Sequence, residues 1–169
     1  MEFHHKPVLF EETIRSLAIR PEGTYIDGTM GGGGHSEAIL KQLTTGRLLS
    51  IDQDPDAIQA AGKRLAPYPQ SIRVRGNFSQ MAELARAQGI DAVDGVLLDI
   101  GVSSYQLDTP ERGFSYHHDA PLDMRMSKEG PSARDLVNTL GQQELADIIF
   151  RYGEDRSARR IAQGIVQAR

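Results

Sequence analysis

The chain of 169 residues contains the stretch Tyr25-Ile26-Asp27-Gly28-Thr29-Met30-Gly31-Gly32-Gly33-Gly34-His35-Ser36, which indicates its fold class. An apolar run typical of a β-strand leads into a glycine-rich turn, and helical periodicity follows the turn. Glycines let the backbone turn sharply and approach a ligand closely, and the N–H groups at a helix start can bind an anion. The motif alone is a weak indication of a cofactor site, because dinucleotide enzymes share it and a flexible loop without a ligand stays an alternative.

Apolar runs and helical segments alternate around this motif. We expect strands at 24–27, 47–52, 72–75 and 95–100, and helices at 36–43, 55–65 and about 79–88. Asp54 and Ser79 are the predicted caps of the last two helices, and Gly89 is a predicted stop. Near-continuous hydrophobicity is typical of strands that are buried on both faces of a parallel sheet. The pattern predicts an α/β fold with a doubly wound, mainly parallel, Rossmann-like sheet.

The character of the sequence changes after Gln106. A polar stretch rich in turn residues is followed by helical signals at 132–140, at 142–152 before Gly153, and at 156–168. We therefore expect a cofactor-binding domain over residues 1–106 and the start of a helical substrate-recognition insert over residues 107–169. The last helix reaches the C-terminus without a stop signal, and only four strands are recognisable, so we expect an incomplete sheet and a truncated insert.

Composition excludes several classes of protein. The chain has no cysteine, which rules out disulfides, zinc–thiolate sites and a cysteine nucleophile, and we expect no metal site. The net charge of −4 means that any nucleic-acid contact must come from a local patch. No apolar run approaches the roughly 20 residues of a membrane span, and the polar N-terminus does not resemble a signal peptide. A cytoplasmic protein that does not enter membranes is therefore expected, and the sequence leaves its oligomeric state open.

Asp27 favours one class of cofactor over another. It lies at the predicted strand tip, where an unpaired carboxylate would repel the pyrophosphate of a dinucleotide. S-adenosylmethionine instead presents a cationic ammonium and a cationic sulfonium, which a carboxylate attracts. The alternative is that Asp27 only caps the loop through Asx-type hydrogen bonds.

Three further candidate residues lie at or just after the ends of predicted strands. Asp52 comes 25 residues after Asp27, and doubly wound folds place an acid about 20 residues past the glycine loop to bind ribose hydroxyls. Phe78 could cover one face of an adenine, although an ordinary core phenylalanine is nearly as well supported. Asp99 ends the fourth predicted strand, where a ligand would meet its reaction partner or where the carboxylate would cap the next turn.

Taken together, these residues resemble one family closely, the ribosomal RNA small subunit methyltransferase H family of cytosine-N4 methyltransferases. The matching stretches are HKPVLFEE (5–12), YIDGTMGGGGHS (25–36), IDQDPDAI (51–58), GNFS (76–79), LLDIGVSSYQLDTPERGFSY (97–116), DAPLDMRM (119–126) and YGEDRSARRIA (152–162). They cover nearly the whole chain, and the block from Asp99 to Met126 is the specific part. Family members are much longer, so this chain would be a fragment or a natural truncation.

The resemblance implies S-adenosyl-L-methionine as the cofactor and a cytosine of 16S ribosomal RNA in the small ribosomal subunit as the substrate. The cofactor-binding residues that it implies are Gly33, Gly34, His35, Asp52, Phe78, Asp99 and Gln106. Asp99 is also the candidate catalytic residue, because a carboxylate that accepts a hydrogen bond from N4 would help to localise the nitrogen lone pair. The chain lacks the Asp-Pro-Pro-aromatic motif of typical amino-methyltransferases, so Asp99 could instead serve in cofactor binding alone.

A local patch could contact the RNA. Residues 151–169 carry an excess of three positive charges, from Arg151, Arg156, Arg159, Arg160 and Arg169. Arginines on a helix more often form a solvated face. Two other classes of function stay open: a non-catalytic cofactor-binding fragment and a dinucleotide-binding oxidoreductase.

Overall fold

The structure is a computed structural model that describes residues 9–169. The chain forms two compact units, each treated separately below. The first contains the chain up to Ser104 together with Met126–Lys128, and the second contains Tyr105–Arg125 and Glu129–Arg169. The segment His5–Pro7 and the first half of the HKPVLFEE stretch lie outside the described residues.

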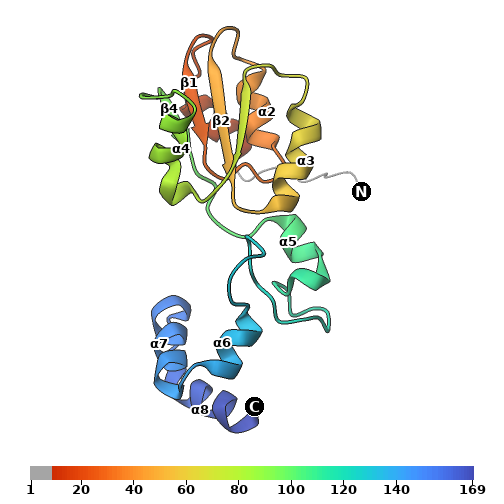
Figure 1. Ribbon diagram of the computed structural model, residues 1–169, viewed down its shortest axis with the longest axis vertical. Helices are drawn as coiled ribbons and strands as arrows, with labels where there is room; N and C mark the ends of the chain where they lie inside the picture. The colour runs from red at the N-terminus through yellow and green to blue at the C-terminus, as the bar shows by residue number, and fades with distance from the viewer. Residues whose placement is uncertain (1–8) are drawn as a thin grey trace. The chain divides into compact units, whose positions relative to one another are not determined.

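The first unit is built on a parallel sheet of four strands in the order β3-β2-β1-β4 (Figure 1). The strands are β1 (Thr24–Asp27), β2 (Arg47–Asp52), β3 (Ser71–Arg75) and β4 (Gly95–Leu97). Asp27 is in register with Ser50 of β2 and with Leu97 of β4, so the carboxyl ends of these strands meet at one edge. The glycine-rich loop leaves the sheet at this edge, where open α/β sheets bind ligands.

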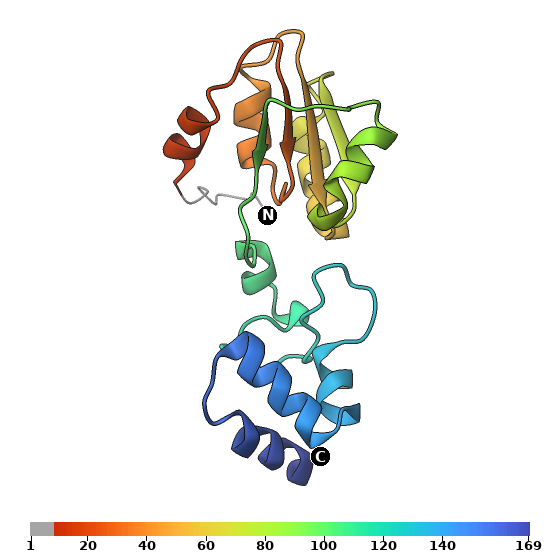
Figure 2. The same ribbon diagram turned by 90° about the vertical axis from the view of Figure 1, so that its left-hand side faces the viewer.

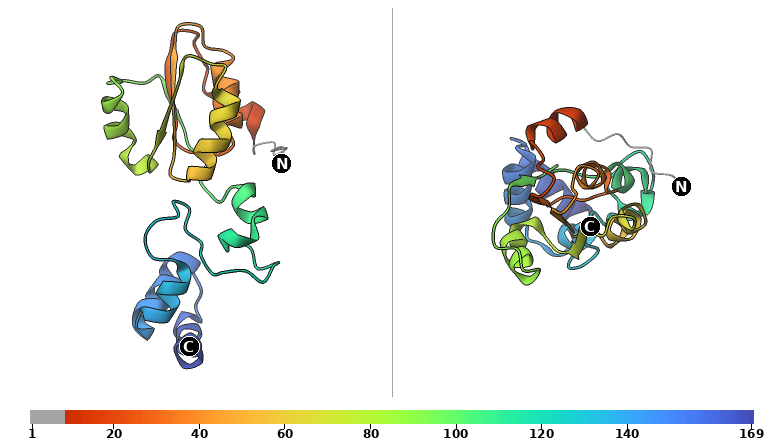
Figure 3. Two further views of the ribbon diagram at one scale, coloured as in Figure 1. Left: turned by 45° about the vertical axis from the view of Figure 1, so that its right-hand side comes forward. Right: turned by 90° about the horizontal axis from the view of Figure 1, so that it is seen from above.

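Helices cover both faces of the sheet, which confirms the doubly wound α/β prediction (Figures 1 and 3). The helices α1 (Phe10–Ser16), α2 (Gly34–Leu40) and α3 (Pro55–Leu65) lie on one face, around a core that includes Tyr25, Leu40 and Leu48. The short 3-10 turn η1 (Phe78–Gln80) leads into α4 (Met81–Ala87), which packs on the other face against Ile26, Leu49 and Ile51. Figure 2 shows the strands side by side, and the left-hand view of Figure 3 shows the sheet between its two layers of helices.

Most predicted boundaries agree with the structure, and the differences have local causes. Asp54 caps α3 by accepting a hydrogen bond from Asp56 N at 3.0 Å, as predicted. Ser79 is not a cap, because the Asn77 side chain accepts a hydrogen bond from Ser79 N at 2.9 Å and starts the η1 turn. The helix α2 begins at Gly34 and ends at Leu40, earlier at both ends than the periodicity predicts. The helix α1 was not predicted.

The strand β4 is shorter than expected. It ends at Leu97, which is 4% exposed, whereas Val96 and Leu98 are 42% and 41% exposed. The hydrophobicity of the run 95–100 predicts burial on both faces, but alternate side chains face outward here. Only β1 and β2, in the middle of the sheet, have the continuous burial that the prediction requires.

The second unit is mainly helical. After α5 (Ser104–Asp108) and the 3-10 turn η2 (Pro110–Arg112) it contains α6 (Ala133–Thr139), α7 (Gln142–Gly153) and α8 (Ala158–Ala168). Leu145, Ala146 and Ala162 form its core. The helix α7 ends at Gly153, one residue later than predicted, and the left-handed residue after the helix is Glu154, with φ of 53°, in place of the glycine. In the described part of the chain, no helix has the length and hydrophobicity to cross a membrane.

Candidate functional site

The loop after β1 is fastened to the ends of the two neighbouring strands. On the β4 side, Gly28 N donates to Leu97 O at 2.9 Å and Asp99 N donates to the Thr29 hydroxyl at 2.7 Å. On the β2 side, Met30 N donates to Ile51 O at 3.0 Å. A Cβ atom at Gly28 would lie 2.6 Å from Leu98 Cδ2, so a larger residue here would require the Leu98 side chain to move. The loop is thus held in one conformation at the carboxyl edge of the sheet.

Asp27, the last residue of β1, accepts hydrogen bonds through its side chain from the loop and from α2. Its side chain is fully buried, and its oxygens accept hydrogen bonds from Thr29 N at 3.1 Å and from the Ser36 hydroxyl at 2.6 Å. The bond to Thr29 is the Asx-type capping interaction that the sequence left as an alternative. Burial raises the pKa of Asp27 to about 6, although both hydrogen bonds oppose the shift. The charges of Asp52 and Asp99 raise it further, which puts three carboxylates near one another.

Ser36 extends this network toward β2. Its hydroxyl lies 2.9 Å from that of Ser50, and both side chains are buried. The two serines therefore give the buried carboxylate of Asp27 a polar surrounding inside an otherwise apolar layer. Sequence analysis did not single out either serine. Ser36 could have been found from its place two residues after the glycine run, at the start of the helix that the loop feeds.

Asp52 lies at the end of β2, partly accessible, and shapes the same loop. One carboxylate oxygen accepts a hydrogen bond from Gly31 N at 2.8 Å, and the other accepts from Asp54 N at 2.9 Å. Burial raises the pKa of Asp52, and the N–H groups of Asp54 and Gly31 counteract that effect. Each carboxylate oxygen can accept a second hydrogen bond, so the side chain can still bind ligand hydroxyls.

The end of the glycine run presents Gly33, Gly34 and His35 at the start of α2. Gly33 has a φ of 78°, a conformation that favours glycine, and a Cβ atom there would lie 3.2 Å from Ala61 Cβ. His35 is 6% exposed, and burial lowers its pKa while the nearby charge of Asp99 opposes the shift. Its Nε2 atom is buried and has no hydrogen-bond partner in the described chain.

Two of the other predicted residues flank this edge. Phe78 begins η1 after β3 and is partly buried; its Cβ lies 3.2 Å from where a Cβ on Gly28 would be. Asp99 follows β4 and is exposed. The first unit therefore brings together six of the seven predicted cofactor residues, namely Gly33, Gly34, His35, Asp52, Phe78 and Asp99.

The seventh predicted residue, Gln106, belongs to the second unit, on α5, where its side chain is buried. The part of the distinctive block that lies in the same unit, residues 105–125, contains a network of charged side chains. Arg125 binds both oxygens of Asp123 and the carbonyl of Gly130, while its own carbonyl accepts from buried Arg112 at 2.9 Å. These contacts give the Arg112–Arg125 part of the block a structural role.

The first unit also contains a segment that sequence analysis did not connect with it. Met126–Lys128 returns to the sheet edge, where the Gln53 amide lies 3.3 Å from Met126 Sδ and Asn77 donates to Gln53 at 3.0 Å. Lys128 pairs with Asp56 at 2.7 Å. Gln53 directly follows Asp52, so this segment lies close to Asp52 in the structure.

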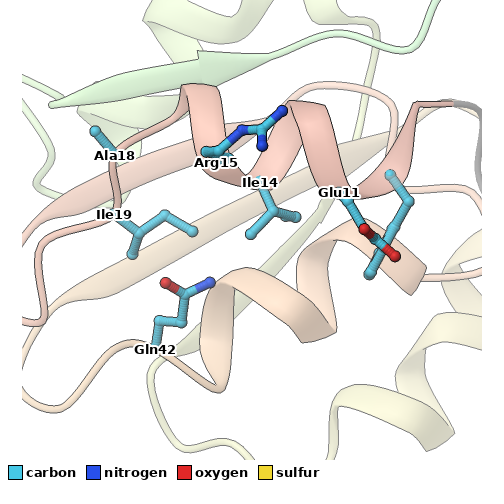
Figure 4. A pocket seen from close by; sticks show the side chains of 7 residues that line it. Glu11, Ile14, Arg15, Ala18, Ile19 and Gln42 are labelled. Carbon is cyan, nitrogen blue, oxygen red and sulfur yellow. The ribbon is translucent and has the colours of Figure 1, made fainter.

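A hollow of about 550 Å³ lies on the face of the sheet that α1, α2 and α3 cover, between α1 and the end of α2 (Figure 4). Its lining residues are Phe10, Glu11, Ile14, Arg15, Ala18, Ile19 and Gln42. None of the predicted cofactor residues lines it. Within residues 9–169, no group of three His, Asp or Glu side chains could hold a metal ion.

Comparison with known proteins gives the family. Residues 2–169 match the profile of the MraW methylase family. The chain belongs to this family. A relative from Symbiobacterium thermophilum, named ribosomal RNA small subunit methyltransferase H, is 56% identical over the whole chain and 54% of its own length. The protein of the same name from Carboxydothermus hydrogenoformans is 52% identical over the whole chain and 55% of its own length. The chain thus spans about half the length of these MraW methylase relatives.

Among solved structures, the C-terminal domain of precorrin-6Y C5,15-methyltransferase from Rhodobacter capsulatus is similar at a TM-score of 0.48 and 22% identity. The likeness covers 63% of this chain and 56% of that domain. The family assignment depends on the sequence relatives and not on this likeness.

Proposed function

We propose that this chain carries the S-adenosyl-L-methionine-binding part of an enzyme that methylates the N4 amine of a cytosine in 16S ribosomal RNA. The single observation that carries the proposal is that carboxylate side chains of the protein already accept hydrogen bonds from N–H groups of the glycine loop. Two loop N–H groups, of Thr29 and Gly31, already donate to Asp27 and Asp52. A dinucleotide would need such N–H groups for its pyrophosphate, so this loop favours a cationic ligand over a phosphate.

The residues present fit the cofactor. Asp52 has lone pairs free for ribose hydroxyls, and Phe78 offers an apolar ring beside Gly28 for an adenine. The carboxylates of Asp27, Asp52 and Asp99 interact electrostatically at this edge and favour a ligand with positive charge. The unpartnered Nε2 of His35 and the left-handed Gly33 offer polar and close backbone contacts to the amino-acid end.

The main catalytic task of the protein is to position the cytosine amine relative to the methyl group. When bound, the cofactor supplies an electrophilic methyl group on a sulfonium. The N4 lone pair of cytosine is delocalised into the ring, so Asp99 serves by accepting a hydrogen bond from the amine and holding the nitrogen in line. Exposed Asp99 can reach a substrate base, provided that the base is unpaired or flipped out of its helix.

In this proposal, arginines of the second unit contact the RNA. Arg151, Arg156, Arg159 and Arg160 are exposed and can neutralise phosphates. Arg169 differs, because its guanidinium donates to Val137 O at 3.0 Å and to Leu140 O at 2.9 Å and so caps the end of α6. The patch proposed for RNA is therefore the first four arginines.

Two measurements test the proposal. Calorimetric titration of the chain should give saturable binding of S-adenosylmethionine and none of NAD; the reverse result would restore the oxidoreductase alternative. The second measurement compares methyl transfer to unmodified small subunits by this chain and by a chimera that adds the remaining part of the Symbiobacterium thermophilum relative. N4-methylcytidine from the chimera supports the proposal. Cofactor binding without transfer by the chimera would leave only a binding module.

A further inference from the structure

Two of the sequence motifs meet through an aromatic pair. Phe10, from the HKPVLFEE stretch, is the first residue of α1, and His35, from the glycine motif, is the second residue of α2. Their rings stack with centroids 5.5 Å apart and an interplanar angle of 24°. The site described above uses His35 but gives no role to the helix α1.

The stack leaves one polar atom of His35 in an unusual position. Its Nε2 is buried and has no partner among residues 9–169. A buried polar atom without a partner lowers stability, and a ligand that supplies the missing partner removes that cost. A free imidazole could rotate about its side-chain torsion to reach water. The ring of Phe10 against its face restricts that rotation.

Asp99 shows on which side of His35 the candidate site lies. Its charge influences the imidazole electrostatically, and its backbone N–H is fastened to Thr29 of the glycine loop. The imidazole therefore lies close to the edge where the candidate site is built. The stack holds it from the side of α1.

We infer that Phe10 is a positioning residue: its ring holds the neutral imidazole of His35 so that Nε2–H can donate a hydrogen bond to the carboxylate of an amino-acid-type ligand. This inference rests on the proposed function, in which that ligand is the methionine end of S-adenosylmethionine. Phe10 itself touches no ligand in this arrangement. It acts only through His35.

The competing explanation is that Phe10 merely packs α1 against the rest of the unit. Three variants separate the two. Phe10→Leu keeps an apolar side chain but loses the stack, Phe10→Tyr keeps the ring, and Ile14→Ala removes apolar volume from the same helix, where Ile14 packs against the core. Each is measured for S-adenosylmethionine affinity by calorimetry and for thermal stability. The nitrogen chemical shifts of the His35 ring report its tautomer, and His35→Gln identifies its signals.

In the wild type, the shifts should show a single neutral tautomer with the proton on Nε2, and cofactor should move the Nε2 signal. Phe10→Leu should weaken binding about tenfold, as expected for one lost hydrogen bond, and should mix the tautomers. Phe10→Tyr should keep both properties. Ile14→Ala should lower the melting temperature and leave affinity and tautomer unchanged.

Several results would overturn the inference. They are a wild-type tautomer with the proton on Nδ1, unchanged affinity in Phe10→Leu, or an equal loss of affinity in Ile14→Ala. The wild-type spectrum decides even if Phe10→Leu fails to fold. If the wild type does not bind S-adenosylmethionine at all, the proposed function fails. The tautomer measurements on Phe10→Leu and Phe10→Tyr then still decide whether the stack sets the state of His35.

Discussion

The carboxylate of Asp52 is joined to the backbone N–H of Gly31 by a hydrogen bond of 2.8 Å. This bond ties the turn after β1 to the end of β2. One side chain therefore shapes the glycine loop and keeps lone pairs available for a ligand. Changes at Asp52 should consequently affect both the loop and the ligand.

Replacing Asp52 with alanine should weaken S-adenosylmethionine binding by about 1–3 kcal/mol, because charged hydrogen bonds are lost. Calorimetry measures the effect. Asp56→Ala is the matched control, since it also removes one negative charge from the same region but takes no ligand-binding residue away; it breaks the ion pair with Lys128. Equal affinities for wild type and Asp52→Ala would remove Asp52 from the site.

Asp99→Asn should separate catalysis from binding. An amide can still occupy the position but is a poorer acceptor for the N4 hydrogen, so the single-turnover rate of the chimera should fall more than cofactor affinity does. The rate is followed by the formation of N4-methylcytidine in the RNA, and the affinity by calorimetry. If rate and affinity fall together, Asp99 is a cofactor ligand and has no catalytic role.

Asp27→Asn should change how stability depends on pH. The pKa of Asp27 is about 6 in the folded protein and 3.8 when unfolded. The folded state therefore binds the proton more tightly, and this contribution to stability is present below pH 3.8 and lost as the pH rises through 6. Relative to Asp27→Asn, the wild type should lose about 2 kcal/mol between pH 4 and pH 7. Denaturant unfolding at several pH values measures the difference, and a difference that stays constant would contradict the buried carboxylate.

Arg169→Ala should destabilise the second unit by about 1 kcal/mol, because two carbonyls at the end of α6 lose their donor. Protection of the α6 amides from hydrogen exchange should fall accordingly. Arg159→Ala, an exposed arginine of the proposed RNA patch, is the control and should leave the exchange unchanged. Similar exchange in both variants would mean that the α6 cap contributes nothing.

The sequence was sufficient to predict the fold class and to place most of the candidate site residues at the carboxyl ends of the strands. The four strands follow from the apolar runs and the glycine turn, and Asp54 as a cap follows from Pro55 after it. Boundaries failed where a local hydrogen bond competed with periodicity, as when the Asn77 side chain displaced Ser79 as the cap.

Contacts between distant segments could not be predicted in the same way. The pairing of Phe10 with His35, and the return of Met126–Lys128 to the edge beside Gln53, join segments that no local periodicity connects. The hydrogen-bond partners of Asp27 could not be predicted from the sequence either. Its charge favoured a cationic ligand, but only the structure shows that Thr29 and Ser36 already occupy its oxygens.

The buried carboxylate of Asp27 has a consequence for calorimetry. With a pKa of about 6, it is roughly half protonated at pH 6 in the free protein. A cationic ligand nearby favours the charged carboxylate, so binding should release part of a proton into the solvent. The heat measured at pH 6 should therefore vary with the ionisation enthalpy of the buffer. At pH 8, where Asp27 has already lost its proton, this carboxylate should release none on binding.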